Sequence, residues 1–208
     1  MCLKSGAAIL LLVSVIPALV AGEEAVRLSP VEVSPIKGDL HQLRCFDNVG
    51  VIAFTGEEGT LLVDTGYGAS AEAVRDELSK LSGLPIRLIV NTHADMDHVG
   101  GNAILSDGAI VIAHPAVRRS MRRFHALEPI ETPGQPTVTI ATESTIHFNG
   151  EDVRLLPIPG GHSSGDVVVH FTEHKVACVG DMVLLGTFPN ADPGRGGDAQ
   201  QLVENLEH

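Results

Sequence analysis

The chain of 208 residues is long enough for one domain with a hydrophobic core, and its 44% hydrophobic and 19% charged residues are typical of a globular protein. Its formal net charge of −12 and its pI near 5.1 argue against nucleic acid or an anionic membrane surface as a partner. Aromatic residues make up only 3% of the chain, so we expect a core built from Val, Leu, Ile and Ala.

The first residues have the pattern of a secretory signal peptide. Lys4 gives a positive start, residues 7–20 are apolar, and small residues precede an acidic segment. The apolar run is short for a bilayer span and contains Pro17, which disfavours the alternative of a membrane anchor. We therefore expect residues 1–22 to be a signal peptide, residues 23–208 to form the domain, and the protein to be periplasmic or secreted, with no membrane contact beyond the signal peptide.

Two cysteines follow the predicted signal peptide, Cys45 and Cys178. An exported protein meets an oxidising compartment, which allows a disulfide, but two cysteines alone are no disulfide framework. Cys178 lies in the apolar run KVACVGD, which favours a small core residue instead. The sequence leaves both a disulfide and two free thiols open.

The first half of the domain alternates strand and helix patterns. Residues 23–40 are interpreted as a leader with at most an edge strand. The apolar runs 49–54 and 60–63, joined by Gly-Glu-Glu-Gly, predict a hairpin. Residues 69–83 carry an apolar stripe at helical spacing, and residues 86–90 (IRLIV) predict a short buried strand.

The second half is predicted to be rich in strands. A strand over residues 109–114 and a helix over residues 115–127 precede a proline-containing loop. Five short strands are then expected, over residues 137–141, 145–148, 153–158, 166–171 and 175–180, and the sequence closes with a glycine loop and a helix. This order predicts a layered α/β fold with two sheets packed face to face and helices outside.

The polar segment NTHADMDHVGGN follows the predicted strand 86–90 directly. Its candidate ligands are His93, Asp95, Asp97 and His98. Side chains two apart at the end of a strand point to the same side, so His93 and Asp95 can face one point. Imidazole and carboxylate ligands suit zinc, with iron or manganese as alternatives. The segment therefore predicts a metal site.

The same segment resembles the H-x-H-x-D-H signature of the metallo-β-lactamase superfamily of metal-dependent hydrolases. Three further segments are similar to this family and occur in its order: LLVDTG, GGHSSGDVVV and VGDMVL, at residues 61–66, 160–169 and 179–184. The resemblance covers nearly all of the chain after residue 22. It implies a four-layer αββα sandwich of metallo-β-lactamase type.

The resemblance also implies how the ligands are divided. The first metal would be held by His93, Asp95 and His162, and the second by Asp97, His98 and a further histidine. Asp181 would bridge the two ions, and Asp64 would fix the loop rather than bind metal.

The activity that the resemblance implies is hydrolysis. A metal-bound hydroxide, with Asp97 as the catalytic carboxylate, would attack a carbonyl or ester carbon of a small substrate such as a lactam, lactone, ester or thioester. One or two zinc ions would be the cofactor. The sequence carries no code for the substrate or the oligomeric state.

Two departures from the family pattern stand out. Asp95 occupies a position where the family usually has histidine, and a carboxylate there would favour harder ions. The last histidine of the family pattern is not found after Asp181, and His208 is a poor substitute because it lies in a helical pattern. We therefore expect that the sequence is truncated and lacks a last strand and helix, or that the second metal has one ligand fewer.

Two alternatives remain open from the sequence. A descendant of the fold that binds metal or a ligand without turnover would retain most of the same residues. The segment GHSSG also matches the G-x-S-x-G pattern of serine hydrolases, with Ser163 as nucleophile. That pattern requires a helix after the serine, whereas a strand is predicted here, which makes the serine mechanism the weaker alternative.

Overall fold

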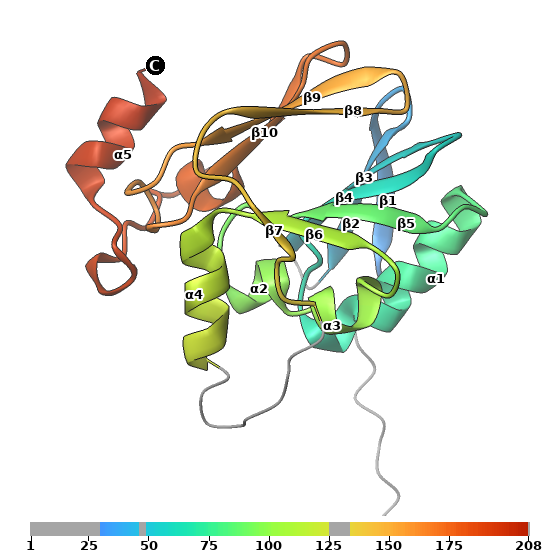
Figure 1. Cartoon of the computed structure of the whole chain (residues 1–208), viewed down its shortest axis with the longest axis horizontal. Coiled ribbons are helices and arrows are strands. Elements are labelled where there is room, and N and C mark those ends of the chain that lie inside the picture. The colour runs from blue at the N-terminus through green and yellow to red at the C-terminus, as the bar shows by residue number, and fades with distance from the viewer. Residues whose placement is uncertain (1–29, 46–48, 125–133, 208) are drawn as a thin grey trace, which may run out of the picture.

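A computed structural model of the chain describes residues 30–45, 49–124 and 134–207, so the predicted signal peptide lies outside the described residues. Two sheets face each other, with helices against the outer side of the larger one (Figure 1). The larger sheet has seven strands in the order β1-β2-β3-β4-β5-β6-β7, and the smaller has four in the order β11-β10-β9-β8. The predicted metallo-β-lactamase type of α/β fold is confirmed.

The elements have the following bounds. The larger sheet contains β1 (Glu32–Lys37), β2 (Leu40–Cys45), β3 (Val49–Gly56), β4 (Gly59–Val63), β5 (Ile86–Val90), β6 (Ile110–Ala113) and β7 (Val138–Thr139). The smaller contains β8 (Ser144–Phe148), β9 (Glu151–Pro157), β10 (Val167–Phe171) and β11 (Val176–Cys178). The helices are α1 (Ala71–Leu81), α2 (Met96–Val99), α3 (Asn102–Leu105), α4 (Pro115–Phe124) and α5 (Ala199–Leu206), with 3-10 turns η2 (Gly68–Ser70), η3 (Gly180–Met182) and η4 (Pro193–Arg195).

The central strands of the larger sheet have apolar clusters on both faces. Leu62 and Ile89 belong to an apolar cluster shared with helix α1, whereas Leu61 and Val90 belong to the cluster between the two sheets. Successive side chains of a strand point to opposite faces, so neighbouring residues enter different clusters. A strand covered on both sides has no polar face, which is why β4 and β5 both end in apolar runs, residues 61–63 and 88–90.

Most of the predicted elements are confirmed, and one strand was missed. The hairpin is β3 and β4, the helix after it is α1, and the strand before the polar segment is β5. Strand β2 was not predicted because its pattern does not alternate. Its Leu40 packs between the sheets and its Leu43 packs on the helix side, with partly exposed residues between them.

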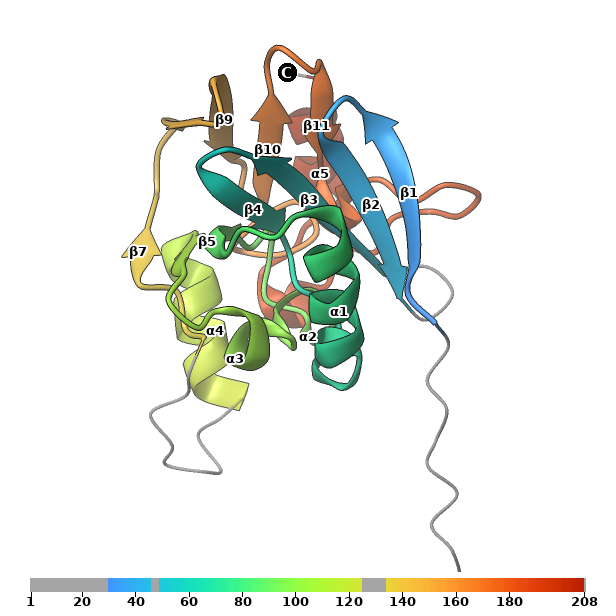
Figure 2. The ribbon, with the colours of Figure 1, turned by 90° about the vertical axis from the view of Figure 1, so that its right-hand side faces the viewer.

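The topology gathers the ends of several strands at one edge. Strands β4, β5 and β6 pair in parallel, so their carboxyl ends lie side by side. The smaller sheet adds the loop between β9 and β10 and the segment after β11. Helix α5 lies near that end of the molecule, at the left of Figure 1 and on the far side in Figure 2. Loops at the carboxyl ends of parallel strands are the usual place for ligands in α/β folds.

Cys45 and Cys178 are free thiols in different sheets, Cys45 in β2 of the larger sheet and Cys178 in β11 of the smaller one. Cys45 belongs to the cluster on the helix side, and Cys178 packs against the cluster between the sheets. The structure therefore favours free thiols over the disulfide that the sequence left open. Within the described ranges, no helix combines the length and the apolar character needed to cross a membrane.

Candidate metal centre

The loops after β4 and β5 are joined by one buried carboxylate. Asp64 has a left-handed backbone conformation with a φ of 60°. Its Oδ1 accepts a hydrogen bond from the backbone N of Thr92 at 2.8 Å, and its Oδ2 accepts one from the Thr92 hydroxyl at 2.6 Å. The same Oδ2 contacts His98 Nδ1 at 2.8 Å. Asp64 thus holds the start of the predicted metal segment in place.

The hydrogen bonds of Thr92 and Asp64 orient two histidine rings. Because the Thr92 hydroxyl donates to Asp64, it can only accept from His93 Nδ1, which lies 3.0 Å away. His98 Nδ1 donates to Asp64. The Nε2 atoms of both rings therefore face the site and are the nitrogens that a bound metal would use.

His162 is oriented in the same way by a different loop. Its Nδ1 donates a hydrogen bond to the carbonyl oxygen of Asn190 at 2.5 Å, so its Nε2 also points toward the candidate metal site. The loop after η3 lies against His162 without space for a side chain, because a Cβ on Gly197 would lie 2.2 Å from the His162 carbonyl oxygen.

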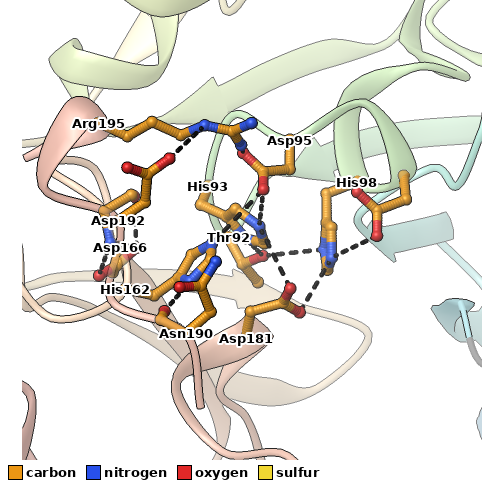
Figure 3. A network of polar contacts seen from close by, with 12 residues as sticks. Thr92, His93, Asp95, His98, His162, Asp166, Asp181, Asn190, Asp192 and Arg195 are labelled. Atoms are coloured by element: carbon orange, nitrogen blue, oxygen red, sulfur yellow. Dashed lines mark hydrogen bonds and ion pairs between the residues drawn. The ribbon is translucent and has the colours of Figure 1, made fainter. Parts of the chain in front are cut away.

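Two groups of side chains converge and share one carboxylate. The first consists of His93, His162 and Asp181, and the second of Asp97, His98 and Asp181; in each, the potential ligand atoms lie within 4.8 Å of one another. Asp181 Oδ1 lies 3.2 Å from His98 Nε2, and Asp181 Oδ2 lies 4.0 Å from His93 Nε2 (Figure 3).

Gly180 allows Asp181 to reach this position. Its φ is +55°, which favours glycine, and a Cβ there would lie 2.9 Å from the Thr92 hydroxyl. The segment after β11 can therefore pack directly against the segment after β5.

Asp95 lies between the first ligand group and the guanidinium of Arg195. Its Oδ2 is 3.8 Å from His93 Nε2 and 3.5 Å from His162 Nε2. Its Oδ1 forms an ion pair with Arg195, as Figure 3 shows. Asp95 is thus placed to contribute one oxygen to a metal.

The carboxylates and the burial of the rings shift the pKa values strongly. Burial and the adjacent His98 lower the pKa of His93 to about 4. Burial also acts to lower the pKa of His98, but Asp64 and Asp181 outweigh it and raise that pKa to about 11. The nearby carboxylate of Asp95 raises the pKa of His162 to about 9. A cation that binds here would therefore replace protons on two of the three rings.

The residues fit a metal ion. Buried polar atoms are normally hydrogen-bonded, yet the Nε2 atoms of His93 and His162 are buried and have no hydrogen-bond partner. Both atoms face the carboxylates of Asp95 and Asp181. Imidazole nitrogen and carboxylate oxygen are the donors that zinc takes in hydrolytic sites. All the predicted ligand positions are brought together, and Asp64 stands behind them.

Three contributors were not predicted from the sequence. Asn190 and Arg195 lie far along the chain from the metal segment and belong to no recognised motif. Tyr67 follows β4 and is 39% exposed, and the negative charge of Asp97 raises its pKa. The glycine-rich composition of the segment after Asp181 was the only signal that this loop could approach the site.

Ser163 does not have the surroundings of a serine nucleophile. It lies in the loop between the antiparallel strands β9 and β10, and its hydroxyl donates to Asp166 at 2.5 Å. Within the described part of the chain, no hydrogen bond joins Ser163 to a histidine. Its role is to close the loop that carries His162.

A pocket of about 570 Å³ opens beside Asp95. The N-terminal turn of α4 forms one wall, and the loops that follow β9 and η3 form the others. Its lining includes Ala94, Ala116, Val117, Ser120 and Ser164. The pocket is of a size that suits a small molecule.

Comparison with known proteins agrees with this geometry. Residues 43–208 match the family described as the metallo-beta-lactamase superfamily. The chain belongs to this superfamily. A metallo-beta-lactamase from Cronobacter sakazakii is 26% identical, with a TM-score of 0.64 over 86% of this chain and 71% of that one. A metallo-beta-lactamase from Pontibacter korlensis is 22% identical and shares the fold, with a TM-score of 0.68 over 85% of each chain.

Two curated relatives illustrate the similarity to enzymes of known name. A hydroxyacylglutathione hydrolase from Gloeobacter violaceus is 36% identical over 118 residues, which are 57% of this chain and 42% of that protein. Another, from Erythrobacter litoralis, is 27% identical over 175 residues, or 81% of this chain and 62% of the relative. The chain thus spans less than two thirds of the length of these relatives.

Proposed function

We propose that this protein is a metal-dependent hydrolase that breaks an ester-like bond at a carbonyl carbon of a small substrate. Thioesters are the first substrate class to test. The observation that carries the proposal is the pair of ligand groups sharing Asp181. The thioester preference is supported by the name of the curated relatives, hydroxyacylglutathione hydrolase. Lactones, lactams and oxygen esters are the other classes that the site admits.

The donor set favours zinc. Three imidazole nitrogens and three carboxylates face the site, and bound zinc would supply Lewis acidity and a water of lowered pKa. Iron and manganese are alternatives because carboxylates favour harder ions.

The protein side chains have separate roles in this proposal. His93, His162 and Asp181 hold the reacting centre in a fixed position, since their rings and carboxylate are constrained by hydrogen bonds and burial. Asp97, whose side chain is 28% exposed, would accept the proton of the attacking water. The pocket beside Asp95 would hold a part of the substrate that extends away from the carbonyl group being hydrolysed.

We propose in addition that the protein is exported. The support is the pattern of residues 1–22, with Lys4 before an apolar run. Mass spectrometry of the protein from its native cell envelope tests this. A mature N-terminus near residue 22 is expected, and an intact Met1 in the cytoplasm would contradict export.

The hydrolase proposal is tested by inhibition across a substrate panel of thioesters, lactones, lactams and esters. We expect hydrolysis that a chelator abolishes and that added zinc restores, whereas a serine-directed phosphonate has no effect. The opposite pattern would support Ser163 as the nucleophile and overturn the proposal. His162→Ala should remove activity, and His147→Ala is the matched control because His147 pairs with Asp152 on an exposed strand.

A second candidate is a protein that binds metal without turnover. The carboxylate at position 95 favours it, because an anionic ligand lowers the Lewis acidity of the first metal more than a neutral imidazole would. Firm metal binding with no turnover on any member of the panel would support this candidate over the hydrolase.

A further inference from the structure

Asp95 uses its two oxygens for different partners. Its side chain is only 17% exposed, so its charge is poorly screened by water. Oδ1 is paired with Arg195, and Oδ2 faces the Nε2 atoms of His93 and His162 at 3.8 and 3.5 Å. These separations are close to those between two ligands of one ion when each bond is about 2.1 Å long.

The position of Arg195 is fixed by its own loop. Its Nε lies 3.2 Å from Asp192 Oδ2, and its carbonyl oxygen accepts a hydrogen bond from Ser164 N at 2.9 Å. Asp192 also accepts from Gly194 N at 2.8 Å, which closes the 3-10 turn η4. The guanidinium is therefore held over Asp95 by contacts on both sides, as Figure 3 shows.

The charges explain why a cation is needed at this place. Asp95 adds a third carboxylate to a site that already contains Asp97 and Asp181. A neutral imidazole at the same position would add no charge. Arg195 offsets the charge of Asp95, and its planar fork fixes the direction of the carboxylate.

We propose that Arg195 is a positioning residue that acts with Asp95 as one unit of the metal site. Arg195 occupies Oδ1 and balances its charge, so that Oδ2 serves as a single-oxygen ligand of the first metal. This inference rests on the proposed metal function. It assigns a role to a residue outside every motif and explains how the site accommodates aspartate at position 95.

A double-mutant cycle on metal affinity tests the proposal. The variants are Arg195→Gln, Asp95→His and the two together, and the measured quantity is zinc affinity by competition with a chromophoric chelator. Arg195→Gln should weaken zinc binding about tenfold, since losses of this size follow when a ligand loses its hydrogen-bonding partner. Asp95→His alone should also weaken it, because the charge of Arg195 then faces the metal without a carboxylate between them.

The double variant decides the question. With both changes, a neutral ligand no longer needs a balancing cation, so we expect zinc affinity to return to within about threefold of the unchanged protein, well short of additive losses. Additive losses would overturn the proposal, as would an Arg195→Gln variant with unchanged affinity. The absorption bands of the cobalt-loaded protein should shift in Arg195→Gln, which a change in overall stability alone would not cause.

Arg154→Gln is the matched control. Arg154 pairs with Glu143 and is 42% exposed, close to the 43% of Arg195, but it lies in β9 and faces no ligand. It should leave zinc affinity and the cobalt spectrum unchanged. If the unchanged protein binds no zinc, manganese or cobalt, the proposed function fails together with this inference. If it binds metal and the cycle is additive, this inference alone fails.

Discussion

Asp64 and His98 stand 34 residues apart in the chain, and the Nδ1 of His98 donates a 2.8 Å hydrogen bond to the Oδ2 of Asp64. This contact joins the end of β4 to the segment after β5. It also fixes which ring nitrogen of His98 faces Asp97 and Asp181. The arrangement of the metal ligands therefore depends on the carboxylate of Asp64, which is in neither ligand group.

Asp64→Asn should weaken zinc binding about 10- to 100-fold, the range found when the partner of a ligating histidine is changed. Asparagine tolerates the left-handed conformation that Asp64 adopts, so the fold should be retained. Titration with a competing chelator measures the affinity, and circular dichroism checks the fold. Unchanged affinity in a folded variant would show that Asp64 does not orient His98.

Asp181→Ala should affect both metals, because this carboxylate belongs to both ligand groups. Asp97→Ala should remove about one ion per chain and leave the first group intact. Elemental analysis after gel filtration measures the bound metal. Asp152→Ala, which changes an exposed carboxylate paired with His147, is the control. Equal effects of Asp181→Ala and Asp97→Ala would contradict the sharing of Asp181.

Gly197→Ala should disturb His162 through its backbone. The new Cβ would lie 2.2 Å from the His162 carbonyl oxygen, so the loop carrying Asn190 must move away. We expect a loss of about 1–3 kcal/mol in the free energy of unfolding, typical of overpacking, together with weaker zinc binding. Gly83→Ala is the control, since a Cβ there meets nothing within 4 Å. Urea unfolding with and without zinc separates the two effects, and equal stability of both variants would count against the contact.

Cys45 and Cys178 should remain free and react slowly in the folded protein. Burial raises the pKa of Cys45, and burial together with Asp64 raises the pKa of Cys178 to about 12, so little thiolate forms near neutrality. In the Cys2→Ser chain, a thiol reagent should titrate two groups quickly after denaturation without reductant and far more slowly before it. Fewer than two groups after denaturation would indicate a disulfide.

Local patterns predicted much of the fold and of the metal site. The helix α1 and the hairpin β3–β4 follow from periodicity and turn residues, and the ligands from His93 to His98 form one compact segment. His162 and Asp181 could be assigned only through resemblance to the superfamily, because topology rather than spacing brings them to the same edge.

Other parts could not be read from single segments. Strand β2 was missed because its leucines enter clusters on opposite faces of the sheet and its sequence shows no alternation. Arg195 and Asn190 were missed because their roles depend on a loop that packs on His162, and nothing in the sequence of that loop encodes its partner. A pattern of charges along the chain does not reveal that Arg195 pairs with a residue 100 positions earlier.

The most direct test of the account is a crystal structure of the zinc-loaded protein with anomalous diffraction recorded at the zinc edge. The account predicts a peak bounded by His93 Nε2, His162 Nε2 and Asp181, with Asp95 Oδ2 also facing it, and a second peak bounded by Asp97, His98 and Asp181. Zinc bound elsewhere, or at neither position in crystals containing excess zinc, would contradict it.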